Sequence, residues 1–273
     1  MKLLISKPDS LGDQFIAAGA IQALRRLNPG WQLVWHVRSG MEVIAPVLGA
    51  GVFVPQTMNA PQAEAARLAA RREPLLVLPY PLSPCETWTD EVRRRVNWWA
   101  AFLRATAWDA TALALVNRNW VGDFTVAVAP SAVRIGFSAS AARQPLVNEA
   151  QSLAGTDAPA FTTALTPSFT RSEAGQITDL FAVLEPRLRE IETVPVWRPE
   201  SYGKGVAGPE SRSTPEIVKV TGSARILIAP GVGGDSRRAW GLNNFLRVAE
   251  ALRTGGASVT WLEGPDDAPY LEG

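Results

Sequence analysis

The sequence predicts an α/β fold made of two domains with parallel sheets. Short apolar segments of strand length alternate with segments whose apolar residues recur at helical spacing. Strands interleaved with helices imply a parallel sheet that is covered on both faces. The pattern of strand, glycine-bearing loop and helix begins again near residue 225, after a polar stretch. A chain of 273 residues is long enough for two domains of the usual ~100–200 residues.

The first domain begins with a buried strand at residues 3–5, followed by a helix whose apolar positions start at Phe15. Asn28-Pro29-Gly30 ends this helix, and a strand at residues 31–37 completes a β-α-β unit. Its crossover is expected to be right-handed. The alternation continues through a strand at 52–54, a helix at 60–72, a strand at 75–78 and a helix at 90–106.

The second half of the chain restarts this architecture after a predicted linker. Residues 147–167 are only weakly periodic, whereas residues 178–191 are expected to be helical. The polar residues 200–215 carry Gly and Pro and are predicted to link an N-terminal domain at 1–199 to a C-terminal domain at 216–273. The C-terminal domain holds one β-α-β unit, at 225–229, 243–253 and 258–262. Because one such unit leaves sheet edges open, we expect the second domain to be incomplete. Either the natural chain continues past Gly273, which is favoured about three to one, or the second domain is a remnant.

Composition excludes several classes of protein. The 27 Lys and Arg residues nearly balance 26 Asp and Glu residues, so no nucleic-acid partner is predicted. Cys85 is the single cysteine, which excludes an intramolecular disulfide and favours the cytoplasm. The N-terminal apolar run is too short for a signal peptide, and no apolar run approaches the ~18 residues of a membrane span.

A basic run beside two tryptophans allows two interpretations. Residues 93–95 are all arginine, and Trp98 and Trp99 follow on the same predicted helix. The run could contact the anionic inner leaflet of the cytoplasmic membrane or a phosphorylated, lipid-linked acceptor. A solvated helix face over a Trp-filled core is favoured about two to one, since charge runs commonly do no more than that.

The first loop, Ser10-Leu11-Gly12-Asp13, joins the carboxyl end of a strand to the amino end of a helix. Ligands bind at this position in open α/β sheets, and the free N–H groups and positive dipole of the helix favour anions. Gly12 allows a substrate close to the backbone, and Asp13 could accept a proton from a nucleophilic hydroxyl. The competing hypothesis, favoured by this loop alone, is that Ser10 or Asp13 only caps the helix.

A second loop, at residues 229–240, has the composition of an anion site. Gly231, Gly233 and Gly234 permit a backbone nest around phosphate oxygens, and Ser236 can donate a hydrogen bond. Arg237 and Arg238 supply charge-assisted contacts to a diphosphate. The loop lacks the Gly-x-Gly-x-x-Gly and P-loop patterns, which argues against dinucleotide and ATPase sites. A flexible surface loop with a solvated arginine pair is the alternative.

Several segments together resemble glycosyltransferase family nine, the heptosyltransferase-like enzymes. The resemblance runs from Lys2 through the Ser-Leu-Gly-Asp loop to Pro29 and recurs in Arg134-Ile135-Gly136-Phe137. It continues in Pro230-Gly231 with a basic residue before Trp240, and in residues 262–267. Matches in the same order in both halves are more specific than any single loop.

The resemblance implies a GT-B fold, two Rossmann-like domains facing across a cleft, with metal-independent, inverting sugar transfer from a nucleotide-sugar such as ADP-heptose. The family's general base then falls on Asp13. Its donor-diphosphate contact falls on Arg238 or Arg237, and its acidic nucleoside contact on Asp267. No cofactor or metal is expected, and the acceptor is a glycan such as lipopolysaccharide core or a lipid-linked glycan.

Three further residues belong to the predicted acceptor side: Lys7, Ser10 and Gly12. Lys7 and Arg38 lie near strand ends, where they could line an acceptor cleft or stand on the ordinary surface. The single histidine, His36, is expected to be structural. The competing function is a non-catalytic module that binds a nucleotide or sugar phosphate, since the incomplete second domain could leave this chain inactive by itself.

Overall fold

The computed structural model describes residues 1–57, 59–84, 86–139, 144–155, 161–168, 170–191, 225–228 and 242–261. The chain divides into two compact units, Met1–Val206 and Ala207–Gly273, and each is described by itself. The predicted linker at residues 200–215 lies outside the described residues.

The first unit is built on a parallel sheet, as predicted. Within the described residues its seven strands lie in the order β3-β4-β2-β1-β5-β6-β7, and every neighbouring pair is parallel. The strands are β1 (Lys2–Ser6), β2 (Gln32–Arg38), β3 (Gly51–Val52), β4 (Leu75–Tyr80), β5 (Ala110–Leu113), β6 (Val133–Phe137) and β7 (Thr163–Leu165).

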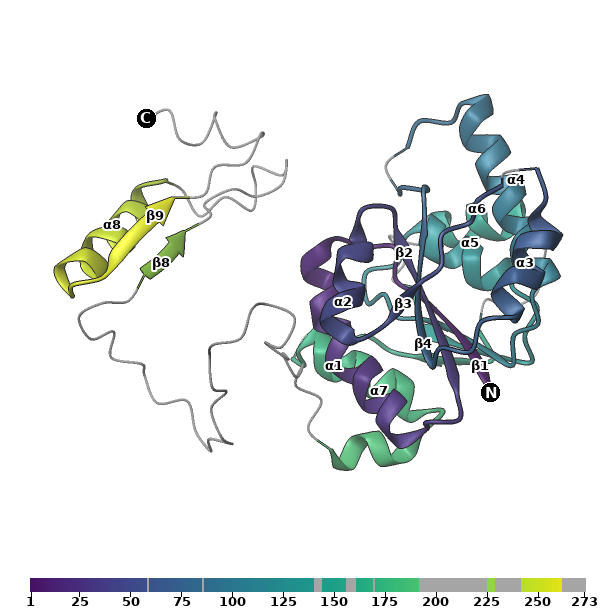
Figure 1. Cartoon of the computed structure of the whole chain (residues 1–273), viewed down its shortest axis with the longest axis horizontal. Helices are drawn as coiled ribbons and strands as arrows, with labels where there is room; N and C mark the ends of the chain where they lie inside the picture. The colour runs from purple at the N-terminus through teal and green to yellow at the C-terminus, as the bar shows by residue number, and fades with distance from the viewer. Residues whose placement is uncertain are drawn as a thin grey trace. The chain divides into compact units, whose positions relative to one another are not determined.

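Helices cover both faces of this sheet (Figure 1). One face is covered by α1 (Leu11–Leu27), η1 (Met41–Ile44), α2 (Ala45–Leu48), α7 (Glu173–Ala182) and η2 (Pro186–Glu190). The other is covered by α3 (Pro61–Ala69), α4 (Asp90–Ala105), α5 (Trp120–Val128) and α6 (Gln144–Ala154). None of the described helices combines the length and apolar character needed to cross a bilayer.

Alternation along the strands divides the core into two layers. In β1, Leu3 and Ile5 pack on the α1 and α7 side, while Leu4 packs on the α4 and α5 side, and all three are fully buried. The second layer is rich in aromatic rings, because Trp99 stacks on Tyr80 at 4.3 Å and on Phe102 at 5.4 Å between ring centroids. Both faces of the central strands are therefore apolar, which explains their near-continuous hydrophobic sequence.

The elements after residue 106 are where the sequence was least informative. β5, α5 and β6 lie outside the predicted elements, and the weakly periodic stretch contains most of α6 and all of β7. The predicted helix at 178–191 is shifted, since α7 begins at Glu173 and a separate 3-10 helix, η2, follows it. In α5, β-branched and aromatic residues form a helix because Asn119 caps it, accepting from the Gly122 N–H at 2.9 Å, and tertiary packing buries nearly all of it.

The second unit contains a β-α-β element at the predicted place. β8 (Arg225–Ile228) pairs in parallel with β9 (Ser258–Trp261), and α8 (Leu242–Thr254) connects them. Among the described residues, Ile228, Ala249 and Ala257 are buried, whereas Leu227 and Leu246 are exposed. A lone β-α-β unit has this pattern, since one helix covers only part of the apolar surface of two strands.

Candidate functional site

The Ser10–Asp13 loop lies at the topological switch point of the sheet. β1 is flanked by β2 on one side and β5 on the other, and the chain fills the β2 side before it returns to β5. The pairing of β1 with β5 extends past the strands, because the Ala114 N–H donates to the Ser6 carbonyl at 3.0 Å. The loops after β1 and β5 therefore diverge at the carboxyl edge of the sheet, where open α/β sheets bind their ligands.

Short-range hydrogen bonds fix the conformation of the β1–α1 loop. The buried Gln14 amide donates to the Lys7 carbonyl at 2.7 Å and to the Asp9 carbonyl at 3.3 Å. The Asp9 N–H donates to the Lys7 carbonyl at 2.8 Å. The loop thus enters α1 in one defined geometry, which is the requirement for a preorganised site.

Asp13 stands in the first turn of α1 and is half-buried. The Ser10 hydroxyl donates to Asp13 Oδ2 at 2.6 Å, and Asp13 Oδ1 has no hydrogen-bond partner among the described residues. Ser10 occupies the N-cap position, but its side chain accepts no N–H of the helix, so the capping hypothesis is wrong for Ser10. One carboxylate oxygen is therefore oriented by Ser10 while the other stays open.

The backbone beside Asp13 is accessible, as the sequence predicts. Gly12 is exposed, and a Cβ added to it would meet no atom within 4 Å. Packing does not require a glycine at this position. The open space over Gly12 is thus available to a ligand that approaches the first turn of α1.

Lys7 corrects one part of the sequence analysis. Its side chain is 0% exposed, so surface placement is wrong, and the ammonium lies behind the loop rather than on it. Lys7 Nζ is 3.0 Å from Glu173 Oε1, in the first turn of α7, and 3.6 Å from Asp9 Oδ2. Because burial of an ammonium is costly unless it is paired, these two carboxylates account for its position.

Three carboxylates gather in front of Lys7. One oxygen each of Asp9, Asp13 and Glu173 lies within 4.8 Å of the others. Burial raises the pKa of the Asp9 carboxyl, and the negative charges of Asp13 and Glu173 raise it further. The positive charge of Lys7 and a hydrogen bond from the Ser10 N–H oppose this rise. Oxygen ligands of this kind suit hard divalent cations, but two of these carboxylates already pair with the Lys7 ammonium. Lys7 is therefore the cation of this cluster, and its carboxylates are candidates for proton transfer.

His36 is structural, as expected. It is fully buried in β2, its Nδ1 lies 3.1 Å from the Ser6 hydroxyl, and its ring packs against Trp99 at 4.8 Å. Burial lowers the pKa of His36 to about 3. The imidazole is consequently neutral at physiological pH and is enclosed in the core.

A buried ion pair supports the other loop of the switch point. Arg118, five residues after β5, donates to Asp123 Oδ1 from Nε at 2.8 Å and also from Nη2. Its Nη1 donates to the Phe137 carbonyl at 3.3 Å, and its guanidinium lies 4.7 Å from the centroid of the Phe161 ring. Arg118 thus ties the loop after β5 to α5 and to the carboxyl end of β6.

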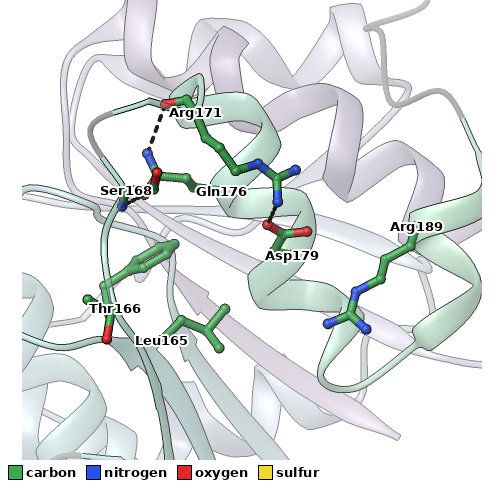
Figure 2. Close-up of a pocket in the computed structure, with 8 residues that line it drawn as sticks. Leu165, Thr166, Ser168, Arg171, Gln176, Asp179 and Arg189 are labelled. Atoms are coloured by element: carbon green, nitrogen blue, oxygen red, sulfur yellow. Dashed lines mark hydrogen bonds and ion pairs between the residues drawn. The ribbon is translucent and has the colours of Figure 1, made fainter.

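A pocket of about 490 Å³ lies at the carboxyl ends of β6 and β7, against α7 and η2 (Figure 2). In the close-up, Leu165 and Thr166 form one side of the pocket and Arg189 the opposite side. Arg171 pairs with Asp179, while Arg189 has no ion pair among the described residues. The lining residues are Phe137, Leu165, Thr166, Ser168, Arg171, Gln176, Asp179 and Arg189.

This pocket and the carboxylate cluster share helix α7. Glu173, in the first turn, contacts Lys7, whereas Gln176 and Asp179, further along the helix, line the pocket. At 1.5 Å per residue, Asp179 lies about 9 Å along the helix axis from Glu173. The same edge of the sheet thus carries the carboxylate cluster and, one to two helical turns away, a pocket lined by Arg189.

The predicted donor-binding residues lie outside the described residues: Gly231, Gly233, Gly234, Ser236, Arg237, Arg238 and Asp267. Cys85 lies outside them as well. These assignments stay predictions.

The basic run on α4 forms a solvated helix face over a Trp-filled core, the second of the two predicted arrangements. Trp98 and Trp99 are buried in the core, and the Arg94 side chain is 74% exposed. Arg95 turns inward to Glu86, 2.8 Å away, and to the Pro81 carbonyl. The tryptophans are therefore unavailable to a membrane, and the solvated face consists of Arg93 and Arg94.

Two members of the site were missed from the sequence. Asp9 stood in the loop without an assigned role, and Glu173 lies 166 positions from Lys7. No local pattern could connect Lys7 with Glu173, because their contact depends on how α7 returns to the α1 face of the sheet. The apolar run that precedes Lys7 was the available signal, since a lysine at the end of a buried strand needs a counter-charge.

Neither the comparison with protein-family models nor that with curated proteins gives a match. Solved structures do match. E. coli heptosyltransferase WaaC with ADP is 14% identical, with a TM-score of 0.52 over 97% of this chain and 68% of that chain. WaaC with ADP-2-deoxy-2-fluoro heptose is 16% identical, with a TM-score of 0.54 over 100% and 74%. A glycosyl transferase family 9 structure from Veillonella parvula is 11% identical, with a TM-score of 0.52 over 98% and 64%.

These matches establish the fold. The chain has an α/β fold of the GT-B glycosyltransferase type, as the sequence predicts. In particular, it shares this fold with the heptosyltransferase WaaC and with a family 9 glycosyltransferase, and it spans about two thirds to three quarters of their length. The resemblance first recognised in the sequence motifs is thereby confirmed at the level of the fold.

Proposed function

We propose that this protein is an inverting glycosyltransferase that moves a sugar from a nucleotide-diphospho-sugar to a glycan acceptor, with Asp13 as general base. The observation that carries the proposal is the position of Asp13 at the switch point, where Ser10 donates to Oδ2 and no described residue bonds to Oδ1. The matched fold supports it, because the solved WaaC structures hold ADP and an ADP-heptose analogue.

The reaction assigns one role to each named group. Asp13 accepts the proton of an acceptor hydroxyl as its oxygen attacks the anomeric carbon of the donor sugar. The bond from that carbon to the diphosphate breaks on the opposite side, and the nucleoside diphosphate leaves. Arg237 or Arg238 and the surrounding glycines are proposed to bind the departing diphosphate, and Asp267 the nucleoside. No metal is required in this scheme, since arginines and backbone N–H groups neutralise the leaving group.

The pocket at α7 gives the acceptor side a second element. Its volume is within the range of small-molecule sites, and Arg189 offers a guanidinium that forms no ion pair with any described residue. We place the part of the acceptor beyond the reacting sugar here, which calls for an acceptor longer than one sugar. A lipopolysaccharide-core glycan, as expected from the sequence resemblance, meets this requirement. We propose that the reaction takes place in the cytoplasm. Any contact with the inner leaflet of the membrane is then made by Arg93 and Arg94.

The test is an assay of sugar transfer by the purified chain from a panel of nucleotide-sugars, including ADP-heptose, to lipopolysaccharide-core acceptors. The measured signal is the nucleoside diphosphate that is released. Asp13→Ala and Asp13→Asn are expected to lower kcat by about 10²–10⁴-fold, the usual contribution of a general base. Nucleotide affinity, measured by calorimetry, should stay near the wild-type value.

Asp90→Asn is the matched control, because Asp90 is an exposed carboxylate in the first turn of α4, on the other face of the sheet. Full activity of Asp13→Asn would refute the assigned role of Asp13. Nucleotide binding by a wild-type chain that transfers none of the sugars would favour the non-catalytic module.

A further inference from the structure

The buried lysine behind the Asp13 loop is not used by the reaction described above. Lys7 touches no open surface, yet its ammonium lies within 3.6 Å of both Glu173 and Asp9. These partners come from the β1–α1 loop and from α7, segments far apart in the sequence. A lysine at this depth is neutralised or paired, and here it is paired.

The charge of the cluster is unbalanced even with Lys7 present. When all its members are ionised, three carboxylates face one ammonium, which leaves a net charge of −2. Like charges at this separation, in a partly buried site, favour uptake of a proton. Among the described residues, Lys7 is the one cation that pairs with this cluster, through Asp9 and Glu173.

Among the described residues no second cation forms an ion pair with the cluster, and Arg171, two positions before Glu173, pairs with Asp179 instead. On β2, His36 is held neutral by burial, which lowers its pKa to about 3. On β5, the positions paired with β1 are Ala110, Thr111, Ala112 and Leu113, which carry no titratable group. On α1, Gln14 is neutral and bonds to the loop carbonyls. Burial raises the pKa of Asp9, the charges of Asp13 and Glu173 add to that rise, and the Lys7 ammonium opposes it.

We propose that Lys7 is a positioning residue for Asp13: its fixed ammonium is the counter-charge that keeps the Asp9, Asp13 and Glu173 cluster ionised, so that Asp13 can accept a proton at neutral pH. This inference rests on the proposed function, because it assumes that Asp13 is the base. The alternative is a mechanical role, in which the Lys7–Glu173 pair only anchors α7 beside the loop. The two roles predict opposite effects of one substitution.

Glu173→Gln separates them in the full chain. The variant removes one negative charge from the cluster and breaks the ion pair with α7. If Lys7 acts through its charge, the acidic limb of the pH profile of kcat/KM moves to lower pH by about one unit. A loss of activity of tenfold or more with an unmoved acidic limb would overturn the proposal in favour of anchoring.

Changes at Lys7 should move the profile the other way. Lys7→Met leaves three carboxylates without a cation, so the acidic limb is expected to move to higher pH, with at least tenfold lower kcat/KM at pH 6 and recovery toward pH 9. Lys7→Met combined with Glu173→Gln restores the wild-type net charge of −2 and should bring the limb back. A double variant as impaired as Lys7→Met would contradict the charge role.

Two further measurements keep the test decisive. Glu185→Gln is the matched control, because Glu185 follows α7 but pairs with Arg187 rather than with Lys7. The acidic limb of the kcat/KM profile of this variant should not move. The carboxyl ¹³C signal of Asp9, followed by NMR against pH, should titrate at lower pH in Glu173→Gln than in wild type. An unchanged Asp9 titration would refute the charge role of Lys7, even in a chain that transfers no sugar. The absence of sugar transfer would by itself count against the proposed function.

Discussion

Removal of Arg118 should destabilise the first unit strongly and in a pH-dependent way. Arg118 and Asp123 are 5% and 2% exposed and bond to each other, and the buried Asp123 Oδ2 has no hydrogen-bond partner among the described residues. In Arg118→Met the apolar stem is largely kept while Asp123 loses its cation. Breaking one partner of a buried pair costs about 3–5 kcal/mol. For a domain of this size that corresponds to a fall in Tm of roughly 6–20 °C, at ~2–4 °C per kcal/mol.

The pH dependence follows from the sign of the Asp123 shift. Burial raises the pKa of Asp123 above its ordinary 3.8, and Arg118 opposes that rise. A carboxyl whose folded pKa is raised contributes stability below its unfolded pKa and loses it as the pH rises through the folded pKa. Loss of Arg118 enlarges the shift, so the deficit of Arg118→Met relative to wild type should be large at pH 7 and smaller at pH 4.5.

Urea unfolding at both pH values measures this deficit. Arg94→Met is the control, because the Arg94 side chain is 74% exposed, and its free energy of unfolding should match that of wild type. Arg118→Met with Asp123→Leu removes both charges and should recover most of the lost stability. An equal deficit at the two pH values, or a double variant as unstable as Arg118→Met, would refute the assignment of a buried, charge-dependent pair.

Four other outcomes are expected. Gly12→Ala should fold with unchanged or slightly higher Tm, because its Cβ meets open space, but its kcat/KM should fall. Gly122→Ala should instead have a lower Tm, because its Cβ would lie 2.6 Å from the Leu113 side chain. Wild type should lose about 2.5 kcal/mol between pH 7 and pH 4.5 through His36, whose folded pKa is lowered from 6.5 to about 3, and urea unfolding of His36→Gln should show a smaller loss. Arg189→Ala should raise the KM for the acceptor and leave the KM for the donor unchanged, and equal effects on both would remove the pocket from the acceptor side. Transfer should proceed at the same rate in excess EDTA, and recovery by added Mg²⁺ after a loss would show that a metal takes part.

Elements with strong periodicity were predicted from sequence because their signal is local. β1, α1 and β2 agree with the predicted segments, since a continuous apolar strand, helical spacing and the Asn-Pro-Gly stop are all encoded within a few residues. β5 and α5 were missed for the opposite reason. Ala110–Leu113 is short and weakly strand-forming, and the β-branched and aromatic composition of α5 favours a strand until its N-cap and burial make it a helix.

The site divides in the same way between local and distant information. The sequence by itself determined that a Ser-Leu-Gly-Asp loop follows the first strand and opens the first helix, and that this position suits an anion and a base. The tertiary structure alone decided that Ser10 orients Asp13 rather than capping α1, and that Lys7 is buried. It also brought Glu173 to Lys7, because α7 returns to the α1 side of the sheet. Loop chemistry is a property of neighbouring residues, whereas the charge that surrounds a carboxylate depends on distant segments that only folding brings together.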